Sequence, residues 1–240
     1  MIDLSRRSTD PEIIDDPASV SPRDMQQTLR ELELVNRWLG GQKACLGAAR
    51  PLVEEIVRSR PGRPVQVLDI GSGGADIPAA LVAWGKQHGW TIEVLAIDFN
   101  WDACRVARDA TAHLSAVSVV QGDVFAPPVR PVSVDLVFCS AFLHHFSNEQ
   151  IAALLGKLRH LARRAVIIND LERHRLAYWG IGLLTRLFSR SAAVRHDGPL
   201  SVRKGFRRKD LDEILSRADI ANARIIHQWW GFRWIVVIDS

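Results

Sequence analysis

Apolar residues from Pro64 onward follow two periods in turn. Short runs that are continuously apolar and rich in valine and isoleucine predict β-strands, whereas apolar residues three and four positions apart predict helices. The predicted strands cover residues 65–70, 91–97, 117–121, 134–139, 165–168, 223–228 and 232–238. Helices are predicted between them, over about residues 77–88, 102–114, 148–162 and 209–218. This alternation indicates an α/β fold over residues 64–240, with a doubly wound, seven-stranded and mostly parallel sheet.

Two further helices are predicted before the sheet, in residues 21–63, and a flexible polar leader before them, in residues 1–20. Pro22 stands at the first position of the first helix, and Gly40-Gly41 separates the two. These two helices carry more apolar residues than packing against one sheet face requires. The surplus predicts that they form a helical lid over a binding site. The alternative is that both helices only complete the core.

An insert of about residues 172–205 interrupts the alternation after the fifth strand. Its apolar stripe predicts one helix, and residues 189–201 after that helix predict a loop. The side chains expected to meet in the lid are Met25, Leu29, Leu32 and Trp38 from the first helix and Leu176, Trp179 and Leu183 from the insert.

Composition narrows the class of protein. With 240 residues, 47% of them hydrophobic and 24% charged, the chain can bury a core, which excludes global disorder. No apolar run reaches the ~20 residues of a membrane helix, and no signal core opens the chain, so we expect a cytoplasmic protein. Its three cysteines are widely spaced in apolar stretches, which favours reduced thiols and predicts no metal site.

The net charge of +4 is unevenly distributed. Residues 157–217 carry fifteen basic and six acidic side chains, a net of +9, so the rest of the chain carries −5. The basic cluster at residues 203–209 is typical of a solvated helix start, or of a contact with an acidic substrate, a membrane surface or a nucleic-acid backbone.

Three acidic residues stand where predicted strands end. Asp69 precedes the glycine-rich turn Gly71-Ser72-Gly73-Gly74, and Asp98 and Asp123 follow the next two strands. Ligands of open α/β sheets bind beyond the carboxyl ends of the strands, where a carboxylate can accept both hydroxyls of a ribose. Asp76 occupies the third glycine position of a dinucleotide fingerprint, which disfavours an NAD-dependent oxidoreductase, and no P-loop lysine follows. The alternatives are a glycine turn without ligand, a helix cap at Asp98 and a turn residue at Asp123.

These segments together resemble the class I S-adenosylmethionine-dependent methyltransferases. LDIGSGGAD is similar to their first motif, AIDF to their ribose-binding acid, GDV to their adenine contact, and DLVFCSAFLHHF to the strand-four segment of small-molecule members. The similarity covers about residues 65–239, and Ala75 replaces the family's third glycine. It implies a Rossmann-like methyltransferase fold and nearness to the small-molecule and quinone-biosynthesis branch.

The resemblance implies a set of cofactor residues. Asp69 would hold the amino group of S-adenosylmethionine, Asp98 its ribose, and Asp123 with Val124 its adenine. The full set expected to bind the cofactor is Asp69, Gly71, Ser72, Gly73, Asp98, Phe99, Gly122, Asp123, Val124 and Ser140.

Two histidines, His144 and His145, follow strand four, where the methyl donor should point. A neutral histidine can deprotonate a hydroxyl, so both are candidate catalytic bases; the alternative is that one supports the loop and the other packs under it. The candidates for substrate binding are Asn36, Arg37, Trp38, Asn169, Asp170, Arg173 and Trp179. Helix capping is the alternative role for Asn169 and Asp170.

The predicted function is methyl transfer to a small, largely apolar acceptor, such as a phenol, a quinone precursor or a polyketide-like molecule, with oxygen favoured over carbon. The alternatives are an RNA methyltransferase that uses the basic segment and a non-catalytic subunit that binds the cofactor. We expect a monomer or homodimer in secondary or other small-molecule biosynthesis, with neither a membrane span nor a nucleic-acid partner.

Overall fold

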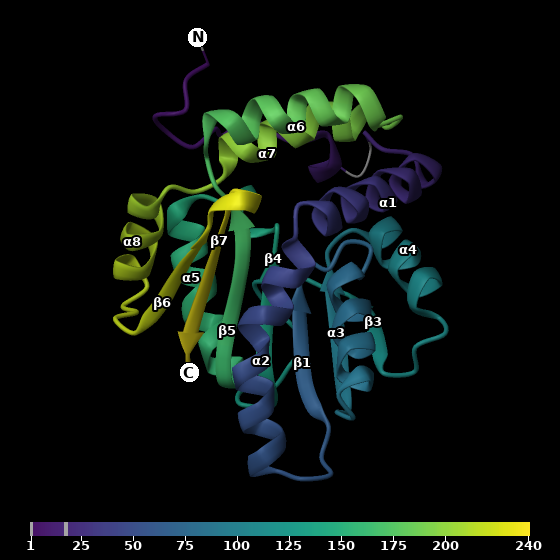
Figure 1. Ribbon diagram of the computed structural model, residues 1–240, viewed down its shortest axis with the longest axis vertical. Helices are drawn as coiled ribbons and strands as arrows, with labels where there is room; N and C mark the ends of the chain where they lie inside the picture. The colour runs from purple at the N-terminus through teal and green to yellow at the C-terminus, as the bar shows by residue number, and fades with distance from the viewer. Residues whose placement is uncertain (1, 17–18) are drawn as a thin grey trace.

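The computed structural model describes residues 2–16 and 19–240. Its centre is one seven-stranded sheet in the order β3-β2-β1-β4-β5-β7-β6 (Figure 1). Every pairing is parallel except those of β7, which runs antiparallel to β5 and β6. The predicted doubly wound, mostly parallel sheet is therefore confirmed. The strands are β1 (Val65–Ile70), β2 (Ile92–Asp98), β3 (Val117–Gln121), β4 (Val134–Ser140), β5 (Ala162–Leu171), β6 (Ala223–Gln228) and β7 (Arg233–Asp239).

Helices cover both faces of this sheet. The eight α-helices among the described residues are α1 (Pro22–Trp38), α2 (Gly41–Ser59), α3 (Asp76–Gln87), α4 (Trp101–Thr111), α5 (Asn148–Leu161), α6 (Arg175–Phe188), α7 (Ala192–Lys204) and α8 (Arg208–Arg217). One core cluster joins α2 and α3 to the sheet, and a second joins α5 and α8 to its other face. The core strands β1, β4 and β7 are buried almost throughout, as their continuous apolar sequence requires.

The predicted lid divides into two helices with different surroundings. α2 lies against the sheet (Figure 1), where Cys45, Leu52 and Val53 are buried in the core. α1 lies instead beside α4 and α7, beyond the carboxyl ends of the strands. Ser21 accepts a hydrogen bond from Asp24 N at 3.2 Å, with Pro22 at the first helical position, so the helix begins where the sequence predicts.

The loop predicted for residues 189–201 is wrong, because α7 covers most of it. Ser191 caps this helix by accepting from Val194 N at 3.2 Å. Gly198 allows α7 to pack closely on α6, since a Cβ there would meet Thr185 Cγ2 at 3.2 Å. Asp197-Gly198-Pro199 is a turn signal by itself, and packing of Val194 and Leu200 in the interior overrides it.

The leader also differs from the loose segment that the sequence predicts. Leu4 and Glu12 are buried, and the Arg7 guanidinium donates to the carbonyl oxygens of Lys204 and His144. Polar contacts with the insert and the loop after β4 thus fix a segment that has little hydrophobic patterning of its own. Residues 1, 17 and 18 of the predicted leader lie outside the described residues.

All three cysteines are buried and free, as the sequence predicts. Within residues 2–16 and 19–240, no helix is both long and apolar enough to cross a membrane.

Candidate functional site

A cavity of about 940 Å³ lies at the carboxyl end of the sheet. Its floor consists of the turns after β1, β2, β3 and β4, and its roof comes from the leader, α1, α6 and α7. Most of the roof side chains are apolar, including Met25, Leu29, Leu32, Leu176 and Ile181. The cavity therefore combines a polar floor with an apolar cover.

The glycine turn after β1 brings its backbone close to the cavity. Gly71 has φ +68°, and a Cβ on it would lie 2.1 Å from Cδ2 of Phe142, so only glycine fits. Ser72 is buried, and its Oγ has no hydrogen-bond partner in the described structure. An unpaired hydroxyl beside a cavity is available for a ligand.

We expect Gly71→Ala to abolish cofactor binding and to destabilise the fold by about 1–3 kcal/mol, because the new methyl group combines left-handed backbone strain with overlap on Phe142. Calorimetry with S-adenosylhomocysteine and urea unfolding measure the two effects. Gly74→Ala is the matched control in the same turn, since its Cβ would meet only Leu29 Cβ, at 3.5 Å. Equal behaviour of the two variants would contradict the assignment.

Two carboxylates at the ends of neighbouring strands line the cavity, the buried Asp69 and the half-buried Asp98. Asp98 accepts from Gly73 N at 2.8 Å and from Asn100 N at 2.9 Å, and so ties the turn after β1 to the turn after β2. Burial raises the pKa of Asp98, although these hydrogen bonds oppose the shift. Burial also raises the pKa of Asp69 well above its usual range, and the charges of Asp76 and Asp98 add to it.

This excess of buried acid suits a ligand with a cationic amine and hydroxyl donors. A positive group near Asp69 would offset its desolvation, and hydroxyls would supply donors to Asp98. Asp123, at the end of β3, also lines the cavity and accepts from Phe125 N at 2.8 Å. The residues present therefore fit the amino acid and ribose ends of S-adenosylmethionine.

His144 is held in one orientation at the edge of the cavity. Its Nδ1 lies 2.7 Å from Asp170 Oδ1, and its Nε2 faces Glu12 Oε1 at 3.7 Å. Both Asp170 and His144 are buried. Burial raises the pKa of Asp170, but the charge and hydrogen bond of His144 outweigh it, so the net shift is downward. Asp170 accepts a hydrogen bond from Nδ1–H and so holds the ring in one orientation, with Nε2 directed toward Glu12.

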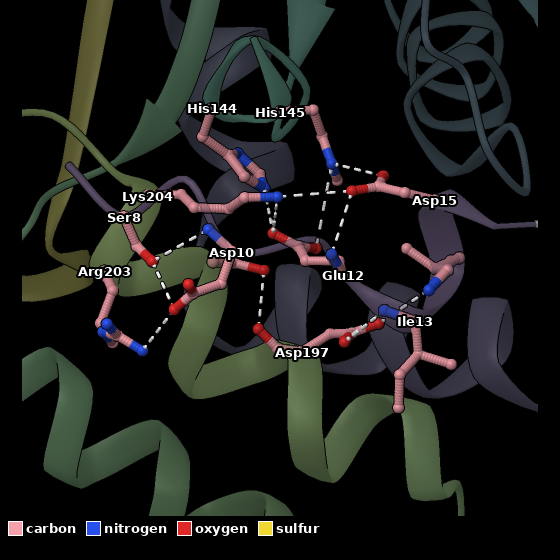
Figure 2. A network of polar contacts seen from close by, with 12 residues as sticks. Ser8, Asp10, Glu12, Ile13, Asp15, His144, His145, Asp197, Arg203 and Lys204 are labelled. Carbon is pink, nitrogen blue, oxygen red and sulfur yellow. Dashed lines mark hydrogen bonds and ion pairs between the residues drawn. The ribbon is translucent and has the colours of Figure 1, made fainter. Parts of the chain in front are cut away.

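The leader closes this edge with a charged network (Figure 2). His145 Nδ1 lies 2.7 Å from Asp15 Oδ1, and Lys204 Nζ lies 3.3 Å from both Glu12 Oε1 and Asp15 Oδ2. Glu12, His144 and His145 offer ligand atoms within 4.8 Å of one another, a spacing that could hold a metal ion. The ammonium group of Lys204 already supplies positive charge to this position, so we assign the cluster to leader attachment.

The pKa values of this network shift in opposite directions. Burial lowers the pKa of His145, but the contact with Asp15 and the charges of Glu12 and Asp15 outweigh it, so the net direction is upward. Burial raises the pKa of Asp15, but His145 and Lys204 bring it down to about 2. The His145 contribution to stability is thus complete below its ordinary pKa and lost as pH rises through the raised one.

We therefore expect the wild-type chain to lose stability relative to Asp15→Asn as pH rises through the raised pKa of His145, because the ring loses its charge there. Below neutral pH the Asp15 contribution is lost only as pH falls toward about 2. Urea unfolding at a series of pH values measures the difference. His113→Gln removes an exposed histidine and serves as control. Parallel pH profiles of wild type and Asp15→Asn would contradict this role.

The structure brings most of the predicted site residues to one cavity. Those that line it are Asn36, Asp69, Gly71, Ser72, Gly73, Asp98, Phe99, Asp123, Val124, Ser140, His144 and His145. Gly122, Arg37, Trp38, Asn169, Asp170, Arg173 and Trp179 are not among the lining residues. Asn169 and Asp170 lie directly behind the lining, where they bond Ser140 Oγ at 2.9 Å and His144.

Neither Arg173 nor Trp179 lies where it could contact a substrate in the cavity. The Arg173 guanidinium is buried and donates to Asp210 Oδ2 at 2.9 Å and to the Leu4 carbonyl at 3.0 Å, so it joins α8 to the leader. Trp179 is 63% exposed and Trp38 70% exposed, on the outer surface. Nothing in the sequence around a single arginine or tryptophan shows whether its side chain will contact a ligand, the protein interior or the solvent.

Several cavity residues were not predicted. Glu12 and Asp15 belong to the polar leader, and Asp76, Trp230 and Arg233 come from three other segments. Asp76 accepts from Asn36 Nδ2 at 2.8 Å, which attaches α1 to the glycine turn. The only sequence signal was the acidic run in the leader, and that signal is equally typical of a solvated segment.

Comparisons with known proteins agree with this geometry. A family model described as a methyltransferase domain matches residues 67–165. No curated protein sequence matches the chain significantly.

Solved structures share the fold at low identity. Magnesium protoporphyrin IX methyltransferase of Synechocystis with bound S-adenosylhomocysteine is 17% identical, with a TM-score of 0.53 over 84% of each chain. A SAM-dependent methyltransferase of Aquifex aeolicus is 17% identical, with a TM-score of 0.51 over 80% of this chain and 92% of its own. Human N-acetylserotonin methyltransferase in complex with SAM is 16% identical, with a TM-score of 0.62 over 95% of this chain. The present chain spans only 57% of that human protein. Residues 67–165 therefore match a methyltransferase domain, and the chain has the fold that these S-adenosylmethionine-dependent methyltransferases share.

Proposed function

We propose that the chain transfers a methyl group to a hydroxyl of a small, largely apolar acceptor, such as a phenol, a quinone precursor or a polyketide-like molecule. The observation that carries this proposal is the composition of the cavity of about 940 Å³ at the carboxyl end of the sheet. Asp69, Asp98 and Asp123 line it together with aliphatic side chains of α1 and α6, and His144 lines it as well. An apolar cover fits an apolar acceptor and excludes water during transfer.

When bound, S-adenosylmethionine supplies an electrophilic methyl group on its sulfonium. Asp69 would accept from the cofactor's amino group, and Asp98 from its ribose hydroxyls. Asp123 and Val124 would contact the adenine, and Phe99, which is 68% exposed, would pack on the adenine face. Gly71 and Gly73 leave room for the methionine part, since neither places a side chain in the turn.

His144 acts as the base in this proposal. Its Nε2 accepts the hydroxyl proton, and Asp170 stabilises the imidazolium that forms. Transfer to an activated ring carbon is the next candidate, because the same base could take the ring proton.

An RNA acceptor is disfavoured by the state of the basic segment. At least seven of its fifteen cations are in ion pairs, which leaves less charge for a phosphate backbone. The paired residues are Arg163, Arg164, Arg173, Arg203, Lys204, Arg208 and Arg217. A cytoplasmic location and a monomeric or homodimeric state stay predictions from the sequence.

Two measurements test the proposed function. Calorimetry should show S-adenosylhomocysteine binding, and transfer of labelled methyl groups should occur to phenols and not to bulk RNA. Absence of S-adenosylhomocysteine binding by folded protein would overturn the cofactor site. Binding of S-adenosylhomocysteine without methyl transfer to any phenol or quinone precursor would favour a non-catalytic subunit. Methyl transfer to RNA alone would favour an RNA methyltransferase.

A further inference from the structure

The outward face of α6 is apolar. Leu176, Trp179, Leu183, Leu187 and Phe188 on this helix are each between 62% and 73% exposed. Figure 1 shows α6 along the outer edge of the molecule, above α7. The opposite face of α6 is buried, because Ile181 and Thr185 pack toward α7. A helix in water normally presents a polar outer face. The exposed apolar side chains of α6 therefore indicate a surface that binds a partner.

The same region carries only positive charge. Residues 175–196 contain Arg175, Arg186, Arg190 and Arg195, all exposed, and no aspartate or glutamate. On a helical projection Arg175 and Arg186 lie along one margin of the apolar stripe. The nearest acid on α1, Glu31, is occupied by the backbone N–H groups of Arg190 and Ser191. Apolar side chains bordered by arginine match the interface of a membrane with anionic lipids.

The stripe continues to the cavity. Leu176 is both 66% exposed and part of the cavity wall. Trp230 is 48% exposed and lines the same cavity. Its ring lies against Gly40, which follows the end of α1, where the exposed Trp38 also stands. An apolar molecule could therefore pass between the outer surface and the cavity without crossing a polar rim.

We propose that the outward face of α6 docks on an anionic lipid bilayer and that the acceptor enters the cavity from the lipid. The docking surface stands on its own geometry, whereas the route of the acceptor rests on the proposed function. The aliphatic and aromatic side chains enter the headgroup boundary, and the arginines bind lipid phosphates. Binding of this kind needs no membrane-spanning helix.

Sedimentation with lipid vesicles tests the docking surface. Wild-type protein should bind vesicles of phosphatidylcholine with one quarter phosphatidylglycerol, and should bind pure phosphatidylcholine or high-salt samples more weakly. The variant Leu183→Ser/Leu187→Ser/Phe188→Ser should lower the partition coefficient by at least about tenfold, because three large apolar side chains no longer leave water. None of the three residues lines the cavity, so its S-adenosylhomocysteine affinity should equal that of wild type.

The matched control replaces exposed apolar residues elsewhere, in Trp101→Ser/Val132→Ser/Ile226→Ser, and should bind vesicles as wild type does. Equal vesicle binding by both variants, or none by wild type, would overturn docking. A wild-type dimer that the α6 variant converts to monomer, without vesicle binding, would overturn it in favour of a second copy of the chain.

The acceptor route has a separate readout. An alkyl phenol dissolved in the vesicles should be methylated several-fold faster by wild type than by the α6 variant, and a water-soluble phenol equally by both. Equal rates on the vesicle-borne phenol would overturn the route. Loss of transfer to every phenol, with vesicle binding that still depends on α6, would defeat the proposed function while docking stands.

Discussion

Asp98→Ala should weaken S-adenosylhomocysteine binding by about a hundredfold. In the proposed site the Asp98 carboxylate accepts two ribose hydroxyls, and hydrogen bonds to a charged group contribute about 1.5–3 kcal/mol each. The substitution also frees Gly73 N, which donates to Asp98 at 2.8 Å and helps to shape the glycine turn. The affinity is measured by calorimetry. The fold should persist, since burial raises the pKa of Asp98 and the charge itself is costly to the folded chain.

Asp109→Ala is the control for this loss, because Asp109 is an exposed acid on α4, the helix that follows Asp98. Its replacement removes the same formal charge without touching the cavity, so cofactor affinity should change little. An Asp98→Ala affinity within a factor of about two of wild type would refute the ribose assignment while leaving the fold intact.

His144→Ala should lower kcat by about a hundredfold to ten-thousandfold at neutral pH, the usual contribution of a general base. The affinity for S-adenosylhomocysteine should stay close to that of wild type. Residual activity should rise with pH toward the pKa of the phenol, since an ionised acceptor needs no base. Steady-state kinetics across pH measure this, and loss of a merely structural histidine would not change the shape of the profile.

Asp170→Asn tests the positioning of His144. An amide at this place can favour the wrong tautomer of the ring, so kcat should fall with little change in cofactor affinity. His160→Ala, an exposed histidine on α5, should keep wild-type kinetics and serves as control. A pH profile of His144→Ala parallel to that of wild type would show that the proton goes elsewhere, with the ring only supporting the loop after β4.

The acidic residues and the glycine turn of the proposed cofactor site could be predicted from the sequence, because both depend on patterns between near neighbours in the chain. Continuous apolar runs predict buried parallel strands, and residues that follow such strands meet at one edge of a sheet. Asp69, Asp98 and Asp123 come from three different strands, yet all three line one cavity. The glycine turn is local as well, since Gly71 needs a left-handed backbone at that residue.

The roof of the site was not predictable in the same way. The leader has no hydrophobic period, and its burial comes from ion pairs with residues more than a hundred positions away, such as His145 and Lys204. α7 contains a turn signal, and only its packing against α6 makes it helical. Arg173 and Trp179 stand six residues apart, and the fold buries one while it exposes the other.

The sequence by itself thus determined the sheet, the order of its helices and the acids at the strand ends, because strand burial, helix period and glycine turns act between near neighbours in the chain. The tertiary structure alone decided how the leader, α1 and the α6–α7 pair cover the cavity, which histidine Asp170 holds, and that α6 turns an apolar face outward. These features depend on contacts between distant segments, whose free energy arises only after the sheet has brought them together.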